Sequence, residues 1–163
     1  MTDDNQTNNI PVGENEKQAI ENQNIFDMLG MRSLQIDEQS DYLEQLQKTI
    51  WDDFLENDVE LLLTGEETEE MIEMISRNDV DDDRKQCMIL EYLMDIIPDL
   101  DEIMVEKASQ LKKDLAIERI ISLEKLFSDD EEKQKVLRQA RAAKDEERWL
   151  DLTDLLNSVQ FSV

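Results

Sequence analysis

The sequence predicts an all-α protein, and three observations support that prediction. Only 3 Gly and 2 Pro occur among 163 residues, which leaves few turn formers for a β protein. Leu, Glu, Lys, Gln, Met and Ile dominate instead, and they favour helices. Apolar residues also recur at spacings of three and four, as at Leu43, Leu46, Ile50 and Phe54. We therefore expect a multi-helix bundle with a disordered N-terminal tail and a C-terminal helical hairpin.

The first 23 residues are rich in Asn, Gln, Asp and Glu, with only scattered apolar side chains. Such a segment cannot bury enough apolar surface to offset the entropy of the chain. We expect residues 1–23 to form a disordered polar tail. A short helix should follow from Ile25 to Leu29, because Gly30 is a suitable C-terminal stop.

Two helices are predicted next, each with a cap that can be recognised locally. Asp37 is the expected N-cap of a helix that runs to about Leu63 and is stopped by Gly65. Thr64 is the expected N-cap of a second helix over residues 66–77. Four glutamates in its first turns suit the positive end of the helix dipole.

The most apolar stretch is Gln86–Ile97, QCMILEYLMDII, in which nine of twelve residues are apolar. A helix that is apolar around most of its circumference belongs at a core. The Asp-rich turn 78–83 supplies its N-cap, and Pro98 ends it. Cys87 is expected to be a small core residue. The sequence leaves open whether this chain or a partner covers the extra apolar face.

The C-terminal third is expected to contain a long helix followed by a hairpin. The long helix spans about 100–127, where apolar residues repeat at intervals of three and four. Ser128 and Glu131 form an S-x-x-E capping box for the next helix. The last two helices, about 129–143 and 146–158, predict an antiparallel hairpin because their connection is short.

The net charge of −25 is unevenly distributed along the chain. Residues 1–106 contain 30 Asp/Glu and 6 Lys/Arg, whereas residues 107–163 contain 12 and 11. We therefore expect an acidic helical bundle over 24–105 and charge-balanced helices over 106–163. The acidic part would repel phosphates, which argues against direct nucleic-acid binding, and it would attract a basic protein. A solvated surface that only maintains solubility is the alternative.

The expected setting is cytoplasmic. The chain has one cysteine and no run of about 18 apolar residues. Its acidic, polar N-terminus does not resemble a secretory signal. We expect no membrane association, and the sequence leaves the oligomeric state open.

The composition excludes most catalytic chemistry and leaves only carboxylates. There is no histidine, one cysteine and no glycine-rich phosphate loop. Asp79, Asp81 and Asp83 occupy positions one, three and five of a possible calcium loop. That loop requires Gly at position six and Glu at position twelve, where this chain has Arg84 and Leu90. A capping turn is the better interpretation, and no cofactor is expected.

A second group of carboxylates, Glu66, Glu67 and Glu70, has the spacing E-E-x-x-E. It resembles the magnesium-binding motif of all-α nucleoside triphosphate pyrophosphohydrolases. The resemblance would imply a magnesium-dependent nucleotide hydrolase. That family also needs E-x-x-D on a facing helix, whereas Glu91 and Asp95 are four residues apart. Acidic residues at the start of a helix are equally expected from the helix dipole.

Partner-binding candidates come from the acidic part of the chain. Adaptable Met-rich surfaces can accept partner helices. The candidate methionines are Met71, Met74, Met88, Met94 and Met104, and the candidate carboxylates are Asp52, Asp53 and Glu56. An ordinary core with Met filling irregular gaps is the preferred alternative for the methionines. The function we expect is a non-enzymatic helical module that binds another protein, basic or helix-presenting.

An acidic nucleic-acid mimic is the alternative within the binding class. The helix predicted before Gly65 would display carboxylates at spacings that imitate phosphates and occupy a DNA- or RNA-binding protein. These carboxylates are Glu44, Asp52, Asp53, Glu56, Asp58 and Glu60.

About a third of the chain also resembles a recurrent type of small protein. The segment is LLLTGEETEEMIEMISRNDVDDDRKQCMILEYLMDIIPDLDEIMVEKASQLKKDL, residues 61–115. It combines an acidic helix, a D-rich turn, an apolar helix, I-P-D-L-D-E-I and a Lys-bearing helix. In these features it is similar to small acidic helical proteins of the ultra-small bacteria of the candidate phyla radiation. The resemblance implies a helical fold and a cytoplasmic setting, and it transfers no site residues.

Overall fold

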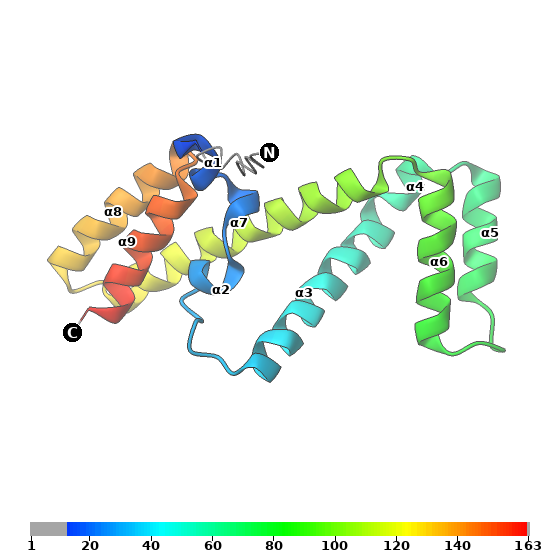
Figure 1. The fold of residues 1–163 in the computed structure, drawn as a ribbon, viewed down its shortest axis with the longest axis horizontal. Coiled ribbons are helices and arrows are strands. Elements are labelled where there is room, and N and C mark those ends of the chain that lie inside the picture. The colour runs from blue at the N-terminus through cyan, green and yellow to red at the C-terminus, as the bar shows by residue number, and fades with distance from the viewer. Residues whose placement is uncertain (1–12, 163) are drawn as a thin grey trace, which may run out of the picture. The chain divides into compact units, whose positions relative to one another are not determined.

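The computed structural model describes residues 13–162 and confirms the all-α fold, with no strand in that range. The elements are α1 (Glu14–Gln18), the 3-10 helix η1 (Ile20–Asn22), α2 (Ile25–Met28), α3 (Ile36–Asn57), α4 (Val59–Leu62), α5 (Gly65–Ile75), α6 (Asp82–Ile96), α7 (Leu100–Leu126), α8 (Glu131–Asp145) and α9 (Trp149–Phe161) (Figure 1). None of these helices is long and apolar enough to cross a membrane.

The chain divides into two compact units, and the division differs from the expected one. The central unit is Leu34–Leu111. The terminal unit joins the two ends of the chain, and its described part is residues 13–33 and 112–162. The expected boundary between residues 105 and 106 therefore lies six residues before the observed one. The segment 24–33, expected in the acidic bundle, belongs to the terminal unit.

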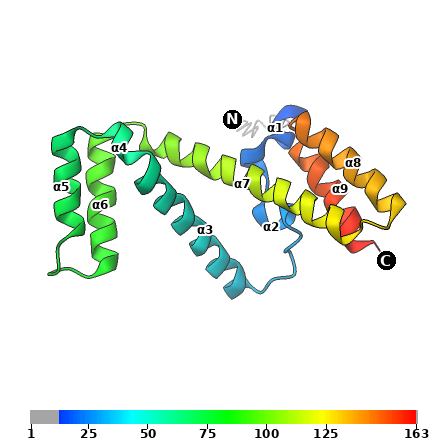
Figure 2. The same cartoon turned by 180° about the vertical axis from the view of Figure 1, so that it is seen from behind.

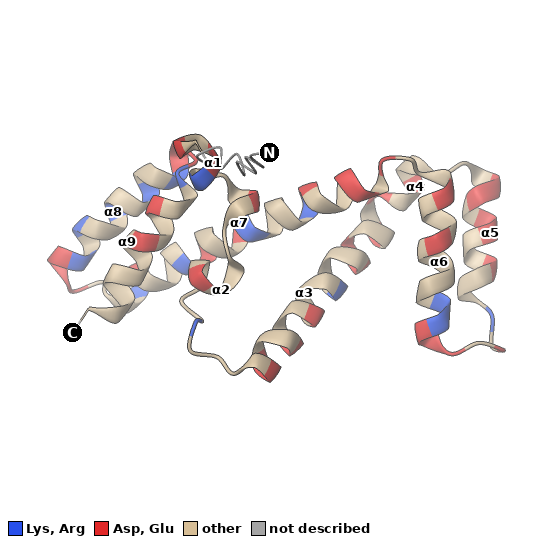
Figure 3. Ribbon diagram, in the orientation of Figure 1, with Lys and Arg blue, Asp and Glu red and all other residues tan. Residues whose placement is uncertain are grey.

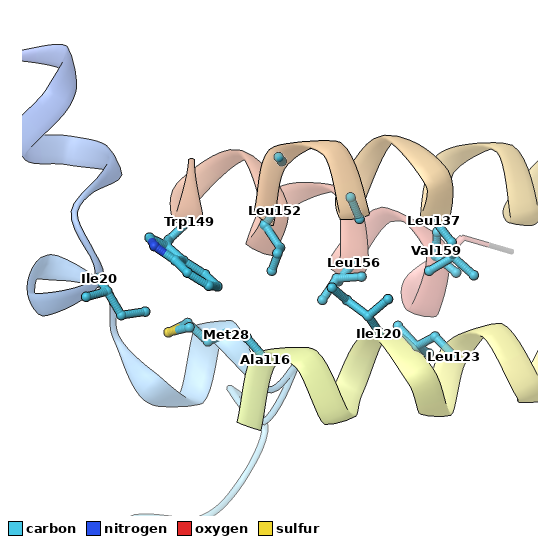
Figure 4. Close-up of a cluster of buried hydrophobic side chains, with 12 residues drawn as sticks. Ile20, Met28, Ala116, Ile120, Leu123, Leu137, Trp149, Leu152, Leu156 and Val159 are labelled. Atoms are coloured by element: carbon cyan, nitrogen blue, oxygen red, sulfur yellow. The ribbon is translucent and has the colours of Figure 1, made fainter. Parts of the chain in front are cut away.

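The terminal unit is built on the α8–α9 hairpin, which confirms the predicted C-terminal pair. The two helices lie side by side in Figures 1 and 2. Asp130 rather than Ser128 caps α8, because its side chain accepts a hydrogen bond of 3.0 Å from the Lys133 amide. Figure 4 shows the core side chains converging from α2, α7, α8 and α9; among them are Met28, Ile120, Leu137, Trp149 and Leu156.

The N-terminal segment is where the prediction of a tail over 1–23 is wrong in part. Residues 1–12 lie outside the described residues, but residues 14–22 form α1 and η1. Ile20 is buried in the core of the terminal unit. The Gln18 Oε1 accepts hydrogen bonds from the Leu150 and Asp151 amides at 3.1 and 3.2 Å. Gln18 therefore caps α9, whose own N-cap residue, Arg148, supplies no side-chain cap.

Hydrogen bonds from a lysine to backbone carbonyl groups also hold this N-terminal segment. Lys112 on α7 donates to the Gln23 carbonyl at 2.8 Å, and it lies within 3.4 Å of the Ile20 and Glu21 carbonyls. Partial burial lowers the pKa of Lys112. After α2, Gly30 adopts a φ of +67° and the Met31 amide donates to the Phe26 carbonyl at 2.7 Å, which ends the helix as predicted.

The central unit contains α3 to α6 and α7 up to Leu111. Its core is formed by Phe54, Val59, Met71, Ile89, Leu93, Ile97 and Leu100. The helices α5 and α6 lie side by side and run in opposite directions in both Figures 1 and 2. This hairpin places Met71 of α5 in the same cluster as Ile89 and Leu93 of α6.

Local capping in this unit follows the sequence in two cases and departs from it in two. The Thr64 hydroxyl accepts from the Glu67 amide at 3.2 Å, and the Thr64 amide donates to Glu67 Oε1 at 3.0 Å. Asp81 caps α6 by accepting from the Arg84 amide at 2.8 Å. Gly65, however, begins α5 instead of stopping the preceding helix. Gln35, not Asp37, caps α3, so Asp37 lies in its first turn.

Candidate functional site

One face of α6 remains uncovered within the central unit. The helix buries Ile89 and Leu93 on one side, as its spacing predicts. Cys87, Leu90 and Met94, at positions i, i+3 and i+7, lie on a different face. Cys87 is exposed, and Leu90 and Met94 are 41% and 51% exposed. We call these three residues the α6 stripe.

The position of Cys87 corrects the sequence-based interpretation. The cysteine was expected in the core because its surroundings in the sequence are apolar on all sides. The structure buries only one stripe of that helix, since the core of the central unit contacts α6 from one direction. A helix in this position needs only about 100° of apolar surface, so the remaining apolar residues face solvent.

A hollow adjoins the α6 stripe between α3 and α6, with a volume of about 590 Å³. We call it the α3–α6 groove. Its lining residues are Glu44, Gln47, Lys48 and Trp51 from α3, and Asp83, Gln86, Cys87 and Leu90 from α6. The Trp51 ring stacks on Phe54 with 5.9 Å between ring centroids. Because Phe54 is fully buried, the core fixes the position of this groove-lining tryptophan.

The groove lies in a strongly acidic unit. Residues 34–111 contain 24 Asp/Glu and 5 Lys/Arg, a net charge of −19, and Figure 3 shows the red positions along α5 and α6. Three of the five cations already pair with carboxylates. Lys48 lies 2.8 Å from Asp52, and Arg77 lies 2.8 Å from Asp79. Lys107 pairs with two aspartates. Because 24 carboxylates face only 5 cations, most of the carboxylates have no cation within the unit.

The carboxylates proposed for a nucleic-acid mimic share in these pairs. Lys107 Nζ lies 2.5 Å from both Asp53 Oδ2 and Asp58 Oδ2, and the hydrogen bond from Lys107 holds the pKa of Asp53 below its usual value. Asp52 is paired with Lys48. Glu56 is exposed. Half of the six carboxylates thus have an internal cation, which weakens the negative stripe along α3 and α4.

The metal candidates are placed in capping and pairing roles. Glu67 closes the capping box of α5, and Asp81 caps α6. Glu70 accepts a hydrogen bond of 2.7 Å from the Tyr92 hydroxyl, and Asp79 accepts from Arg77. Glu66 and Asp83 are exposed. Within residues 13–162, no group of three or more Asp, Glu or Cys side chains is placed to hold a metal ion.

Tyr92 provides a spectroscopic test of this arrangement. Burial and the hydrogen bond to Glu70 raise the pKa of Tyr92 to about 12. Because the folded-state pKa lies above the unfolded value, Tyr92 stabilises the fold below about pH 10, and this contribution is lost as the pH rises toward 12. In Tyr42→Phe, whose only tyrosine is Tyr92, we expect absorbance at 295 nm to titrate near pH 12.

The control for this titration is Glu70→Gln in the same Tyr42→Phe background. Removing the negative charge should lower the Tyr92 midpoint while circular dichroism shows intact helices. An unchanged midpoint would contradict the contact between α5 and α6.

The methionine candidates separate into core and surface residues. Met71 is buried, and Met74 and Met104 are partly buried against the same core. This packing agrees with the preferred interpretation of the methionines as gap-filling core residues. Met88 is half-buried, and Met94 is exposed as part of the α6 stripe.

The terminal unit contains a second hollow, of about 510 Å³, between α1, α7 and the α8–α9 turn. Its cations are paired with neighbouring carboxylates. Arg148 lies 2.7 Å from Glu146 and 2.6 Å from Asp151, and Lys113 lies 3.3 Å from Glu147. Because these cations are already paired with carboxylates, this hollow is a weaker candidate for a binding site than the α3–α6 groove.

Comparisons with protein-family models, curated proteins and solved structures found no match. The resemblance to small acidic bacterial proteins stays a prediction. Six residues of the groove were not singled out by the sequence as a binding site: Gln47, Lys48, Trp51, Gln86, Cys87 and Leu90. The signal that pointed toward Cys87 and Leu90 was the apolar circumference of Gln86–Ile97, which is wider than one neighbouring core requires.

Proposed function

We propose that this chain is a non-enzymatic helical module that binds another protein through the α6 stripe and the adjoining α3–α6 groove. One observation supports this more than any other. The helix that contains the most apolar stretch of this acidic chain buries one side in its own core and exposes Cys87, Leu90 and Met94 on another. Apolar side chains gathered at helical spacing beside a tryptophan are typical of interaction surfaces.

The energetics favour covering this face. Full burial of a Leu or Met side chain contributes about 1.5–3 kcal/mol, so covering the exposed parts of Leu90 and Met94 contributes on the order of 1 kcal/mol each. Trp51, held in place by Phe54, offers a pre-positioned aromatic anchor with little side-chain entropy left to lose. The surrounding carboxylates form the polar rim that such interfaces have.

A capture experiment tests the proposal. The full chain is immobilised beside the double variant Leu90→Glu, Met94→Glu, and lysate proteins are recovered over a range of salt concentrations. We expect the unmodified chain to retain a specific protein that the double variant loses. The matched control is Leu126→Glu, which places a charge on a residue that is 70% exposed in the terminal unit and should retain the protein.

Two results would overturn the proposal. One is the recovery of no specific protein at any salt concentration. The other is a protein that the double variant still retains and that added DNA or RNA displaces. That second result would favour the carboxylates of α3 and α4 as a nucleic-acid mimic.

A further inference from the structure

The two walls of the α3–α6 groove have the same helical spacing. On α3 the lining residues fall at positions 44, 47, 48 and 51, and on α6 at positions 83, 86, 87 and 90. Each wall is therefore one face of about two helical turns, about 10 Å long. The two helices diverge away from the α4 end in Figures 1 and 2, and a third helix can dock against the two inclined faces.

The two ends of the groove also differ in chemical character. Figure 1 shows α3 and α6 running the same way, toward the connection that holds α4, so the later residue on each wall lies at the α4 end. Trp51, Cys87 and Leu90 make that end apolar. Glu44 and Asp83 make the opposite end acidic. Lys48 also lines the groove, but it is paired with Asp52 at 2.8 Å.

The charge of the unit selects the class of occupant. A second copy of this chain would bring another unit with a net charge of −19 against the first, and like charges would oppose that contact. A small apolar ligand fits poorly, since five of the eight lining side chains are charged or amide groups. A helix with apolar and cationic residues on one face matches both ends of the groove.

We infer that the α3–α6 groove binds an amphipathic helix of a partner protein, with apolar side chains against Trp51 and Leu90 and Lys or Arg against Glu44 and Asp83. The two contacts lie about two turns apart, so the occupant's face carries apolar residues at i and i+4 and a cation near i+7. This inference rests on the proposed function and names the partner's chemistry.

Cys87 makes the test direct, because it is the only thiol in the chain, is exposed and lines the groove. The probe is an 18-residue helical peptide with Leu at i and i+4 and Lys at i+7 and i+8. A second peptide has Glu in place of each Lys. Alkylation of Cys87 by iodoacetamide, an uncharged reagent, is followed by mass spectrometry on the full chain. We expect the Lys peptide to slow alkylation at least fivefold at low salt, and the Glu peptide to leave the rate unchanged.

A charge swap in the groove provides the matched variant. Glu44→Lys with Asp83→Lys should lose protection by the Lys peptide and gain protection by the Glu peptide. The control, Asp101→Lys with Glu102→Lys, makes the same change in net charge at two exposed positions outside the groove and should protect like the unmodified chain. Trp51→Ala, with intact helices by circular dichroism, should abolish protection.

The outcomes separate this inference from the proposed function. Three results would overturn the basic-helix inference. Both peptides could protect Cys87 from alkylation equally, neither could protect it, or the Lys peptide could still protect it after the charge swap. If the unmodified chain captures a protein and the Leu90→Glu, Met94→Glu variant does not, the proposed function stands even where the basic-helix inference fails. Failure of the capture experiment would overturn the proposed function whatever the peptides show.

Discussion

Replacing Phe54 by Ala should lower the free energy of unfolding of the central unit by about 3–5 kcal/mol, the usual cost of removing a buried phenylalanine. Phe54 is fully buried near the end of α3 and lies in the core with Leu93 and Ile97. Its ring also stacks on Trp51. The substitution therefore leaves a cavity in the core and removes the support of the groove-lining tryptophan.

The two tryptophans allow the effect to be localised, because Trp51 lies in the central unit and Trp149 in the terminal unit. In a Trp149→Phe background, urea unfolding followed by Trp51 fluorescence should show the full loss for Phe54→Ala. In a Trp51→Phe background, Trp149 fluorescence should show little change. Leu61→Ala is the control within the same unit; Leu61 is 84% exposed and its loss should cost less than about 0.5 kcal/mol. A loss below 1 kcal/mol for Phe54→Ala would contradict the described core.

Helix limits were predictable from sequence where the determinants are local. Thr64 with Glu67, Asp81 before α6 and Gly30 after α2 all act within a few residues of the helix end that they cap. Such signals need no knowledge of tertiary structure. The errors at Asp37 and Ser128 are shifts of two residues between neighbouring polar residues that can each act as a cap.

The α1 and η1 segment was missed because its partners are distant in sequence. Gln18 caps α9 across 132 residues, and Lys112 binds the Gln23 carbonyl across 89. The segment buries a single large apolar side chain in the core of the terminal unit, Ile20, so its composition is that of a tail. Its order comes from hydrogen bonds to α7 and α9, which no local pattern shows.

The candidate site was predictable in part. The apolar circumference of Gln86–Ile97 indicated a helix with more apolar surface than one core needs. Which residues would be left outside depends on the direction from which the rest of the unit contacts α6. That direction is a tertiary property, so Cys87 was assigned to the core, whereas the structure exposes it.

The terminal unit depends on a buried cation whose hydrogen-bond acceptors are all uncharged. Arg119 on α7 is only 8% exposed. Its Nη1 donates to the Met28 carbonyl at 2.7 Å, and its Nη2 donates to Asn157 Oδ1 at 2.8 Å and Gln160 Oε1 at 2.6 Å. Burial lowers the pKa of Arg119 to about 10, so the guanidinium remains charged at neutral pH. One side chain therefore joins the end of α2 to α7 and α9.

Arg119→Ala should cost the terminal unit about 3 kcal/mol, since it leaves the Met28 carbonyl without its donor and opens a cavity. Arg119→Met should cost less, about 1–2 kcal/mol, because it fills the space and also removes the penalty of desolvating an unpaired charge. Both losses are measured by urea unfolding followed by Trp149 fluorescence in the Trp51→Phe background. If Arg119→Met were as destabilising as Arg119→Ala, the charged hydrogen bonds would outweigh both packing and desolvation. A loss below 1 kcal/mol for Arg119→Ala would show that α2 is held to this unit by apolar contacts such as Met28 alone.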